Sequence, residues 1–223
     1  RVLGAEVGAV YRDLHAEHGV ALHLGTSVAS IGGAGHVEEL RLADGTRLAA
    51  DLVVAGIGAF PRVELATAAG LTVDDGIVTD AHLRTSAPDV FAAGDAARAF
   101  HPGLGVHLRV EHWANALHQG VAAAENMLGR AAAYDRVPYF FSDQYDLGME
   151  YSGHATTWDR VVFRGDPRDG KFVAFWLDHG AVVAGMNANV WDVTDDVQRL
   201  VRARVVVDPV RLADPDVPLV DAA

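Results

Sequence analysis

Residues 85–126 read TSAPDVFAAGDAARAFHPGLGVHLRVEHWANALHQGVAAAEN, and the rest of the chain is organised around this stretch. The apolar run Asp89–Ala93 stops at Gly94-Asp95, which is typical of a buried strand that delivers a carboxylate to a sheet edge. A helix follows, with Gly129 placed to end it and with apolar residues three and four apart at Trp113, Ala116, Leu117, Val121, Ala124 and Leu128. A strand end and a helix N-terminus facing one pocket suit a phosphate-bearing, redox-active ring cofactor.

Composition excludes several classes of protein. The 223 residues carry a formal net charge of -12, which argues against a nucleic-acid partner because phosphate neutralisation needs clustered Lys and Arg. With no cysteine, no disulfide or thiolate chemistry lies within these residues, and a cytoplasmic location is expected. No apolar run approaches the roughly 20 residues of a membrane span. The chain starts with Arg1 rather than Met, so we expect it to be part of a longer protein.

The N-terminal part predicts alternating helices and strands. A helical stripe over residues 5–18 is followed by an apolar run at 20–24, which predicts one helix–strand step. Segments 27–31, 36–42 and 47–49 predict a small meander with a turn at Asp44-Gly45. The continuous apolar run 52–58 ends in glycines and predicts a central parallel strand. A short helix at 63–69 and a strand pair at 71–73 and 77–79 lead into the organising stretch.

After Gly129 the pattern changes. Short alternating segments at 138–141, 145–151, 160–164, 171–177 and 181–186 predict an antiparallel sheet. One helix is predicted over residues 194–204, with Val197, Leu200 and Val201 on a single face. We place a domain boundary near Ala133.

Four segments together resemble a known family, namely GIGAFP at 56–61, TSAPDVFAAGD at 85–95, EHWANA at 111–116 and SDQY at 142–145. They are similar to the FAD- and NAD(P)H-dependent ferredoxin reductases of oxygenase systems, the family of the putidaredoxin, rubredoxin and aromatic-ring dioxygenase reductases. The resemblance implies electron transfer from NAD(P)H through FAD to an iron–sulfur ferredoxin or a rubredoxin. Within the wider superfamily, an NADH oxidase or a disulfide reductase is the alternative.

The resemblance also implies a domain division. Residues 1–56 would be the second half of an NAD(P)-binding domain, residues 57–133 the C-terminal half of an FAD-binding domain, and residues 134–223 the C-terminal domain of the reductases. The fold class is thus α/β, a partial two-dinucleotide-binding-domain flavoprotein with Rossmann-like halves, plus an α+β domain with an antiparallel sheet. Neither G-x-G-x-x-G turn of such enzymes occurs. We therefore expect this chain alone to bind FAD weakly or not at all, and a non-catalytic fragment is the third interpretation.

Eight residues are candidates for cofactor binding, and no catalytic residue is named. In the resemblance, Asp95 accepts hydrogen bonds from the ribityl hydroxyls of FAD, and Gly94 allows close approach. The helix start at Glu111, His112 and Trp113 would direct free N–H groups at the flavin pyrimidine. The strand end at Gly56, Ile57 and Gly58 would leave room for the nicotinamide nucleotide. The alternatives are a Gly-Asp turn that caps the next segment, a core tryptophan, and close packing at the glycines.

Further residues have alternative interpretations. Four histidines at 101, 107, 112 and 118 are spaced by six, five and six residues, so adjacent pairs do not share a helical face and no metal site is expected. Phe140, Phe141 and Tyr145 form an aromatic cluster that is either core packing or, by the resemblance, close to the flavin edge. Arg98 and Arg109 are candidates for a basic face toward an acidic ferredoxin.

Overall fold

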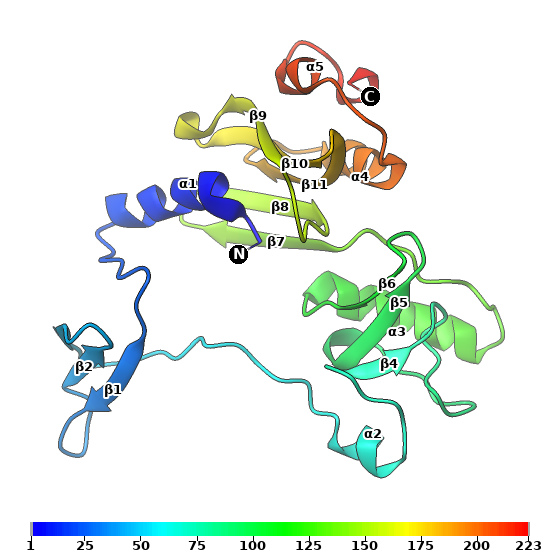
Figure 1. Cartoon of the computed structure of the whole chain (residues 1–223), viewed down its shortest axis with the longest axis horizontal. Coiled ribbons are helices and arrows are strands. Elements are labelled where there is room, and N and C mark those ends of the chain that lie inside the picture. The colour runs from blue at the N-terminus through cyan, green and yellow to red at the C-terminus, as the bar shows by residue number, and fades with distance from the viewer. Residues whose placement is uncertain (1, 223) are drawn as a thin grey trace. The chain divides into compact units, whose positions relative to one another are not determined.

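A computed structural model describes residues 2–222 of the chain. The chain divides into two compact units (Figure 1). The first unit is Val7–Ala59, and the second unit is Phe60–Ala223 together with Arg1–Glu6.

The first unit contains one helix and one small sheet. Helix α1 (Gly4–Glu17) reaches into it, and strands β1 (Val28–Gly32), β2 (Glu39–Leu42) and β3 (Arg47–Ala49) form an antiparallel sheet in the order β1-β2-β3. The turn between β2 and β3 is closed by Thr46 N, which donates to Asp44 Oδ1 at 2.9 Å. The predicted helix and meander are therefore confirmed.

Two strands predicted for the first unit are not formed. Residues 20–24 and 52–58 have no ladder partner among the described residues. The second run is highly exposed, with exposed fractions of 81% at Leu52, 86% at Val54 and 93% at Ile57. A buried parallel strand needs a hydrogen-bonded neighbour and a covered face. Apolar composition favours burial, but it cannot supply the neighbour, so the prediction was wrong for these residues.

The second unit begins with a helix and a three-stranded sheet. Helix α2 (Glu64–Ala68) is followed by Gly70 at φ +72°. Strand β4 (Ile77–Thr79) pairs parallel with β5 (Ala97–His101), and β5 pairs antiparallel with β6 (Val106–Arg109). The predicted strand 71–73 makes only an isolated bridge from Val73 to Ile77. The pairing of β5 with β6 was not predicted.

The strand predicted at Asp89–Ala93 is also absent. Among the described residues its one bridge joins Phe91 to Arg84, and a short 3₁₀ turn, η1 (Gly94–Ala96), follows directly. The regular strand of this region is β5, which comes after the Gly-Asp pair rather than before it. The apolar run therefore packs as irregular chain, with Phe91 against the small cluster around Leu83.

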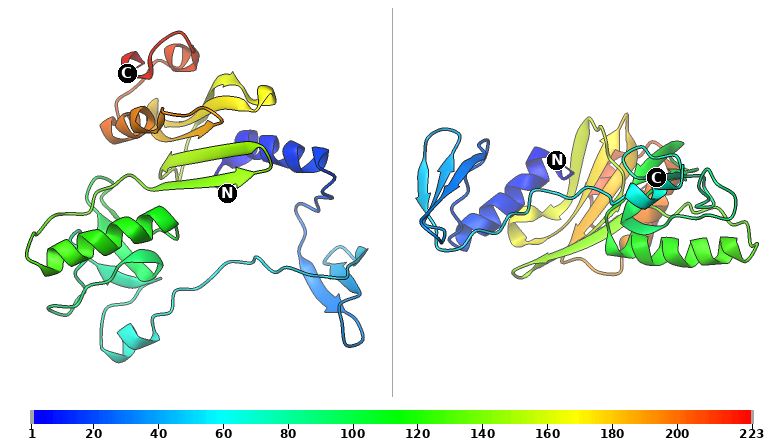
Figure 2. Two further views of the ribbon diagram at one scale, coloured as in Figure 1. Left: turned by 180° about the vertical axis from the view of Figure 1, so that it is seen from behind. Right: turned by 90° about the horizontal axis from the view of Figure 1, so that it is seen from below.

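Helix α3 (Trp113–Met127) forms where the sequence predicts it. Its apolar face, however, points to solvent instead of into the core. Its buried residues are Asn115, Gln119, Ala123 and Asn126. The apolar stripe is exposed, with fractions of 70% at Trp113, 49% at Leu117, 61% at Val121 and 90% at Leu128. Trp113 is therefore not a core residue. Figure 2 shows the helix from two further directions.

Asn126 explains part of this orientation. Its Nδ2 donates to the backbone oxygens of His82 and Ala132, both at 2.9 Å, and its Oδ1 accepts from Ala132 N at 2.8 Å. A buried amide with these bonds cannot be turned to solvent without leaving buried backbone groups unpaired, which costs about 1–3 kcal/mol for each group. These directional bonds hold the amide face of α3 against the neighbouring segments.

The C-terminal part of the second unit is a five-stranded antiparallel sheet in the order β7-β8-β11-β10-β9. Its strands are β7 (Tyr139–Gln144), β8 (Leu147–Gly153), β9 (Arg160–Asp166), β10 (Lys171–Asp178) and β11 (Ala181–Ala188). Helix α4 (Thr194–Ala203) buries Val197, Leu200 and Val201 in the same core as Phe175 and Val182. Both the predicted sheet and the predicted helix are confirmed (Figure 1).

A single carboxylate joins three strands to α4. Glu150 on β8 accepts from Tyr139 Oη at 2.6 Å, Asn187 Nδ2 at 2.9 Å and Thr194 Oγ1 at 2.8 Å. Burial opposes ionisation of this group, but the three hydrogen bonds together outweigh it and hold the pKa of Glu150 below its ordinary value. The ionised carboxylate therefore fixes α4 against the sheet.

The chain end is held by Arg164 on β9. Its guanidinium donates to four backbone oxygens beyond helix α5 (Pro209–Ala213) or at its end, those of Leu212, Asp214, Pro215 and Val217. The planar fork of arginine can serve several acceptors at once. Within residues 2–222, no helix has the length and apolar character needed to cross a membrane.

The rotation of α3 predicts effects of very different size for two nearby substitutions. Asn126→Ala removes three hydrogen bonds and is expected to lower the free energy of unfolding by about 2–4 kcal/mol. Leu128→Ala alters an exposed side chain and is expected to stay within about 0.5 kcal/mol. Urea unfolding followed by circular dichroism measures both. A larger loss for Leu128→Ala than for Asn126→Ala would contradict the observed orientation.

Candidate functional site

The Gly94-Asp95 turn lies directly against α3. Gly94 adopts φ +77°, and its backbone N donates to the buried Oε1 of Gln119 at 2.8 Å. A Cβ at this position would lie 3.5 Å from the Cβ of Ala116, an ordinary contact, so it is the backbone conformation that requires glycine. Asp95 follows on the same turn and is exposed. The turn therefore presents a carboxylate beside the helix.

The N-terminus of α3 points its first amides away from the helix. His112 is the N-cap residue, with an extended backbone and no side-chain capping bond. The first helical bond runs from Ala116 N to His112 O at 3.0 Å, so the N–H groups of Trp113, Ala114 and Asn115 have no intrahelical acceptor. Such amides, with the positive end of the helix dipole, favour an electron-rich ligand.

Asn115 fixes this helix start. Its Nδ2 donates to Val110 O at 3.0 Å, and its Oδ1 accepts from Tyr134 Oη at 3.1 Å. Burial raises the pKa of Tyr134 to about 12, so the phenol stays a donor across the ordinary pH range. Together with Gln119, this amide ties the first two turns of α3 to the turn and to the segment that leads into the C-terminal sheet.

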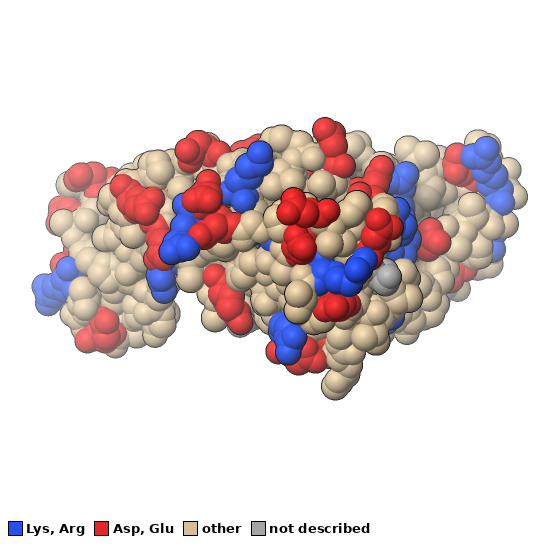
Figure 3. Space-filling model, turned by 90° about the horizontal axis from the view of Figure 1, so that it is seen from above, with Lys and Arg blue, Asp and Glu red and all other residues tan. Residues whose placement is uncertain are grey.

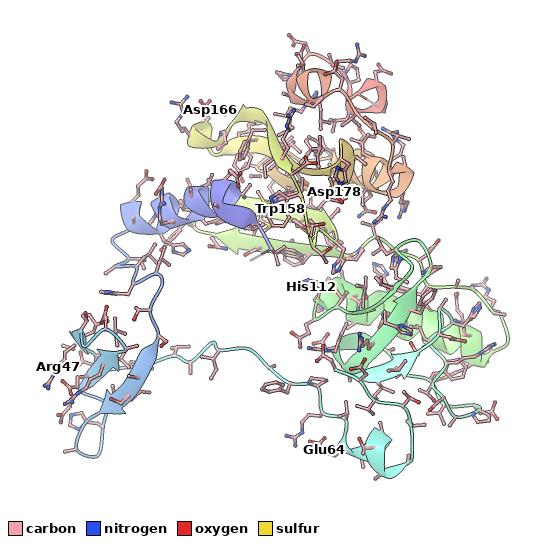
Figure 4. All side chains as sticks on the ribbon, viewed as in Figure 1. Arg47, Glu64, His112, Trp158, Asp166 and Asp178 are labelled. Carbon is pink, nitrogen blue, oxygen red and sulfur yellow. The ribbon has the colours of Figure 1, made fainter. Side chains whose placement is uncertain are left out.

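Charges gather around His112. Burial lowers the pKa of His112, and the carboxylates of Asp95 and Glu111 act in the opposite direction. The imidazole is therefore neutral at pH 7 and has two acidic neighbours. Figure 4 labels His112 near the N-terminal end of α3, and its ring contacts β7 through Phe140.

The structure thus brings five of the eight candidates together, and they are Gly94, Asp95, Glu111, His112 and Trp113. The other three, Gly56, Ile57 and Gly58, belong to the first unit, where they lie on an exposed, irregular segment. Gly58 has φ +95°, a conformation that favours glycine. Their role with a nucleotide stays a prediction.

Gln119 and Asn115 were not predicted from the sequence. Both hold the site in place through buried amides rather than through exposed functional groups. A signal for them existed in the spacing of Asn115, Gln119 and Asn126, since residues four and eleven apart share one helical face. Amides on one helix face, opposite an apolar stripe, indicate that the amides make the tertiary contacts.

The predicted aromatic cluster divides into separate contacts. Phe140 is half-buried and stacks on His112, with ring centroids 4.7 Å apart and an interplanar angle of 17°. Phe141 is 52% exposed and meets Trp113 edge-on at 6.5 Å. Tyr145 is exposed in the turn between β7 and β8. Packing thus accounts for Phe140, whereas Phe141 and Trp113 form an exposed aromatic pair beside the helix N-terminus.

The two candidate basic residues are already paired. Arg98 is hydrogen-bonded to the carboxylate of Asp74. Arg109 is only 15% exposed in its side chain and pairs with both Asp75 and Glu111. Neither guanidinium is therefore free to attract an acidic partner without giving up an existing carboxylate.

The four histidines have four different surroundings. His101 bonds the backbone oxygen of Arg136 at 2.9 Å, His107 meets Phe100 edge-on at 5.3 Å, His112 stacks on Phe140, and His118 contacts the guanidinium of Arg136 at 3.3 Å. In the described part of the chain, the group with a metal-compatible spacing is instead Asp159, Asp178 and His179. Exposed acidic groups of this kind occur commonly without an ion.

The fold is of the mixed α/β class, and its C-terminal part is a five-stranded antiparallel sheet. Residues 1–120 match the family described as pyridine nucleotide-disulphide oxidoreductase, and residues 139–223 match the family described as reductase C-terminal. The chain belongs to the pyridine nucleotide-disulphide oxidoreductase family, and its resemblance to the ferredoxin reductases is confirmed.

Among curated proteins, the chain is 41% identical to the ferredoxin–NAD(+) reductase component of the anthranilate 1,2-dioxygenase system of Burkholderia cepacia, over 98% of this chain and 54% of that protein. It is 38% identical to putidaredoxin reductase of Pseudomonas putida, over 98% of this chain and 53% of that protein. The chain therefore spans about half the length of the curated relatives it matches.

Solved structures agree with this assignment. The ferredoxin reductase of the CYP199A2 system from Rhodopseudomonas palustris matches with a TM-score of 0.94 and 34% identity, covering 100% of this chain and 56% of that one. The covalent complex of putidaredoxin reductase with putidaredoxin matches with a TM-score of 0.89 and 37% identity, covering 97% and 52%. The predicted fold class is confirmed by these matches.

Two half-buried imidazoles predict a loss of stability on mild acidification. Burial lowers the pKa of His112 and of His154, so each binds fewer protons folded than unfolded. Their stabilising contribution is complete above the unfolded pKa of about 6.5 and is lost as the pH falls toward the folded value. We expect the free energy of unfolding to decrease from pH 7.5 to pH 5.5.

Urea titrations at intervals across this window measure the effect. The double replacement His112→Gln and His154→Gln should flatten the profile. His36→Gln, with a side chain that is 75% exposed, is the control and should leave the profile unchanged. A free energy of unfolding that increases on acidification would contradict the lowered pKa of these two imidazoles.

Proposed function

We infer that the whole protein is a flavoprotein reductase that passes electrons from NAD(P)H through FAD to a ferredoxin-type protein. The observation that carries this inference is the meeting of the Gly94-Asp95 turn with the N-terminus of α3. The site fits a flavin because an exposed carboxylate lies near the start of α3, where the first amides have no intrahelical acceptor. Relatives of similar sequence are named as ferredoxin–NAD(+) reductase components and as putidaredoxin reductase.

Each site residue has a proposed role. Asp95 would accept hydrogen bonds from the ribityl hydroxyls, and Gly94 lets the backbone come close to the ligand. The amides at the start of α3 would face the pyrimidine ring of the flavin. Glu111 and His112 are the two residues that lead into this helix start. A bound FAD would accept hydride and release single electrons. The chain's own contribution is a fixed set of donors that favours negative charge on the ring.

Trp113 has a proposed role of a different kind. Its side chain is 70% exposed at the first turn of α3, and Phe141 meets it edge-on. An exposed aromatic pair offers an apolar surface that would cover the isoalloxazine or the nicotinamide and keep water from it. The exposure of this pair supports the proposal over a purely structural role.

The division into domains belongs to the same proposal. Residues 1–56 would continue an NAD(P)-binding domain, residues 57–133 would complete an FAD-binding domain, and residues 134–223 would form the reductase C-terminal domain. Within this scheme, Gly56, Ile57 and Gly58 would leave space for the nicotinamide nucleotide, and the exposure of Ile57 at 93% is compatible with that. A cytoplasmic location is proposed because that compartment maintains reduced NAD(P)H.

The proposed electron acceptor is an iron–sulfur ferredoxin or a rubredoxin. Arg98 and Arg109 are occupied by Asp74, Asp75 and Glu111, so recognition of an acidic partner would rest on other groups. Figure 3 shows acidic and basic side chains interspersed over one face of the molecule. An NADH oxidase or disulfide reductase is the weaker alternative, since the relatives named above are ferredoxin reductases.

The role of Asp95 is testable in the full-length gene product that carries these residues. Asp95→Ala removes hydrogen bonds to a charged acceptor, which are each worth about 1.5–3 kcal/mol. We therefore expect FAD to bind roughly 10- to 100-fold more weakly, measured by quenching of flavin fluorescence.

Asp135→Ala is the matched control, because Asp135 is also an exposed carboxylate but lies outside the turn. It should bind FAD as the wild type does. Equal FAD affinity for Asp95→Ala and the wild type would remove Asp95 from the site.

A further inference from the structure

Four aromatic rings form a continuous series from the start of α3 into the core of the C-terminal sheet. His112 stacks on Phe140 with centroids 4.7 Å apart, Phe140 stacks on Tyr151 at 4.9 Å, and Tyr151 meets Trp176 edge-on at 5.3 Å. The interplanar angles of the two stacked pairs are 17° and 25°. All three contacts lie within the range of attractive ring pairs.

The inner end of this series is rigid. Trp176 is fully buried and Tyr151 is 2% exposed. Phe140 and Tyr151 are directly opposite each other on β7 and β8, and cross-strand aromatic pairs of this kind stabilise a sheet. Close packing holds such side chains in one arrangement. The ring of Phe140 is therefore set by the sheet.

The outer end is the N-cap of α3. His112 has no side-chain capping bond, and its backbone oxygen accepts the first helical bond from Ala116. Its ring contacts Phe140 rather than a polar group of the helix. A displacement of Phe140 would therefore act on the residue at which the helix begins.

We propose that Phe140 is a positioning residue through which the C-terminal sheet holds the N-terminus of α3 beside Asp95. The proposal rests on the proposed function for its consequence, because that helix end is the part of the flavin site described above. The C-terminal sheet then has a second role in addition to forming its own hydrophobic core. The sheet determines where the first amides of the helix point.

The competing explanation is that Asn115 alone fixes the helix start. Its bonds to Val110 and Tyr134 act on the third residue of α3, whereas the stack acts on the N-cap residue. The two explanations differ in what happens when only the ring of Phe140 is removed. If Asn115 is sufficient, the first turn and the His112 imidazole will be unchanged.

The experiment compares Phe140→Leu and Phe140→Ala with Phe163→Ala in the flavin-free chain. Phe163 is the matched control, because it is also a half-buried sheet residue with an aromatic partner, Phe172 at 5.7 Å, and it lies outside the series. Nuclear magnetic resonance measures hydrogen exchange at the Ala116 amide and the titration of the His112 ring. Phe140→Leu keeps most of the volume and guards against a variant that fails to fold.

We expect exchange at Ala116 to be about tenfold faster in Phe140→Leu than in the wild type. The His112 pKa should move up toward about 6.5 as the ring becomes more hydrated. Phe163→Ala should change neither. Unchanged exchange and titration in a folded Phe140→Leu, or equal changes in Phe163→Ala, would overturn the proposal.

A second measurement separates this proposal from the proposed function. In the full-length gene product, the flavin reduction potential of Phe140→Leu is compared with that of the wild type. A shift in potential together with altered exchange at Ala116 supports both inferences. Altered exchange in a protein that binds no flavin at all would retain the positioning role and reject the proposed function.

Discussion

The hydrogen bond from Gly94 N to Gln119 Oε1 is the contact on which the site depends. It joins the turn that carries Asp95 to the second turn of α3. The bond is buried, and its two atoms are 2.8 Å apart. Loss of one partner would leave a buried backbone group unpaired, at about 1–3 kcal/mol. Asn115 and Asn126 add further bonds along the same face of the helix. These three amides set which face of α3 turns toward the neighbouring segments.

This arrangement explains an otherwise unfavourable surface. The helix leaves Trp113, Leu117 and Val121 exposed while it buries amides. Hydrophobic burial is non-directional and contributes in proportion to area, whereas the amides each have fixed partners. Once the backbone groups near α3 are buried, only the amide side of the helix can satisfy them. The apolar stripe is left available as a surface beside the proposed flavin site.

Much of the fold was predictable because the relevant signals are local. The antiparallel sheet and α4 follow from period-two and period-3.6 patterns that each segment carries by itself. The runs 52–58 and 89–93 have strand-like composition, yet a strand exists only with a partner, and partner identity is not a local property. The rotation of α3 could not be read from its apolar stripe, since specific hydrogen bonds decided it.

The site was predictable to a similar extent. Family resemblance singled out Gly94, Asp95 and the start of α3, and the structure brings these residues together. It did not reveal Gln119, whose side chain acts on the backbone of Gly94, or the ring contact between His112 and Phe140. Both depend on distances between segments that are far apart in the sequence. Pairing of Arg98 and Arg109 with neighbouring carboxylates was hidden for the same reason.

The central claim is that the amides at the start of α3 form part of a flavin site. Amide chemical shifts of Trp113, Ala114 and Asn115, measured in the ¹⁵N-labelled full-length gene product with and without FAD, test it most directly. The account predicts that the chemical shifts of these three amides change on FAD binding. The shifts of amides at the far end of the helix, such as that of Met127, should stay the same. Saturation with FAD that leaves all three amides unchanged would contradict it.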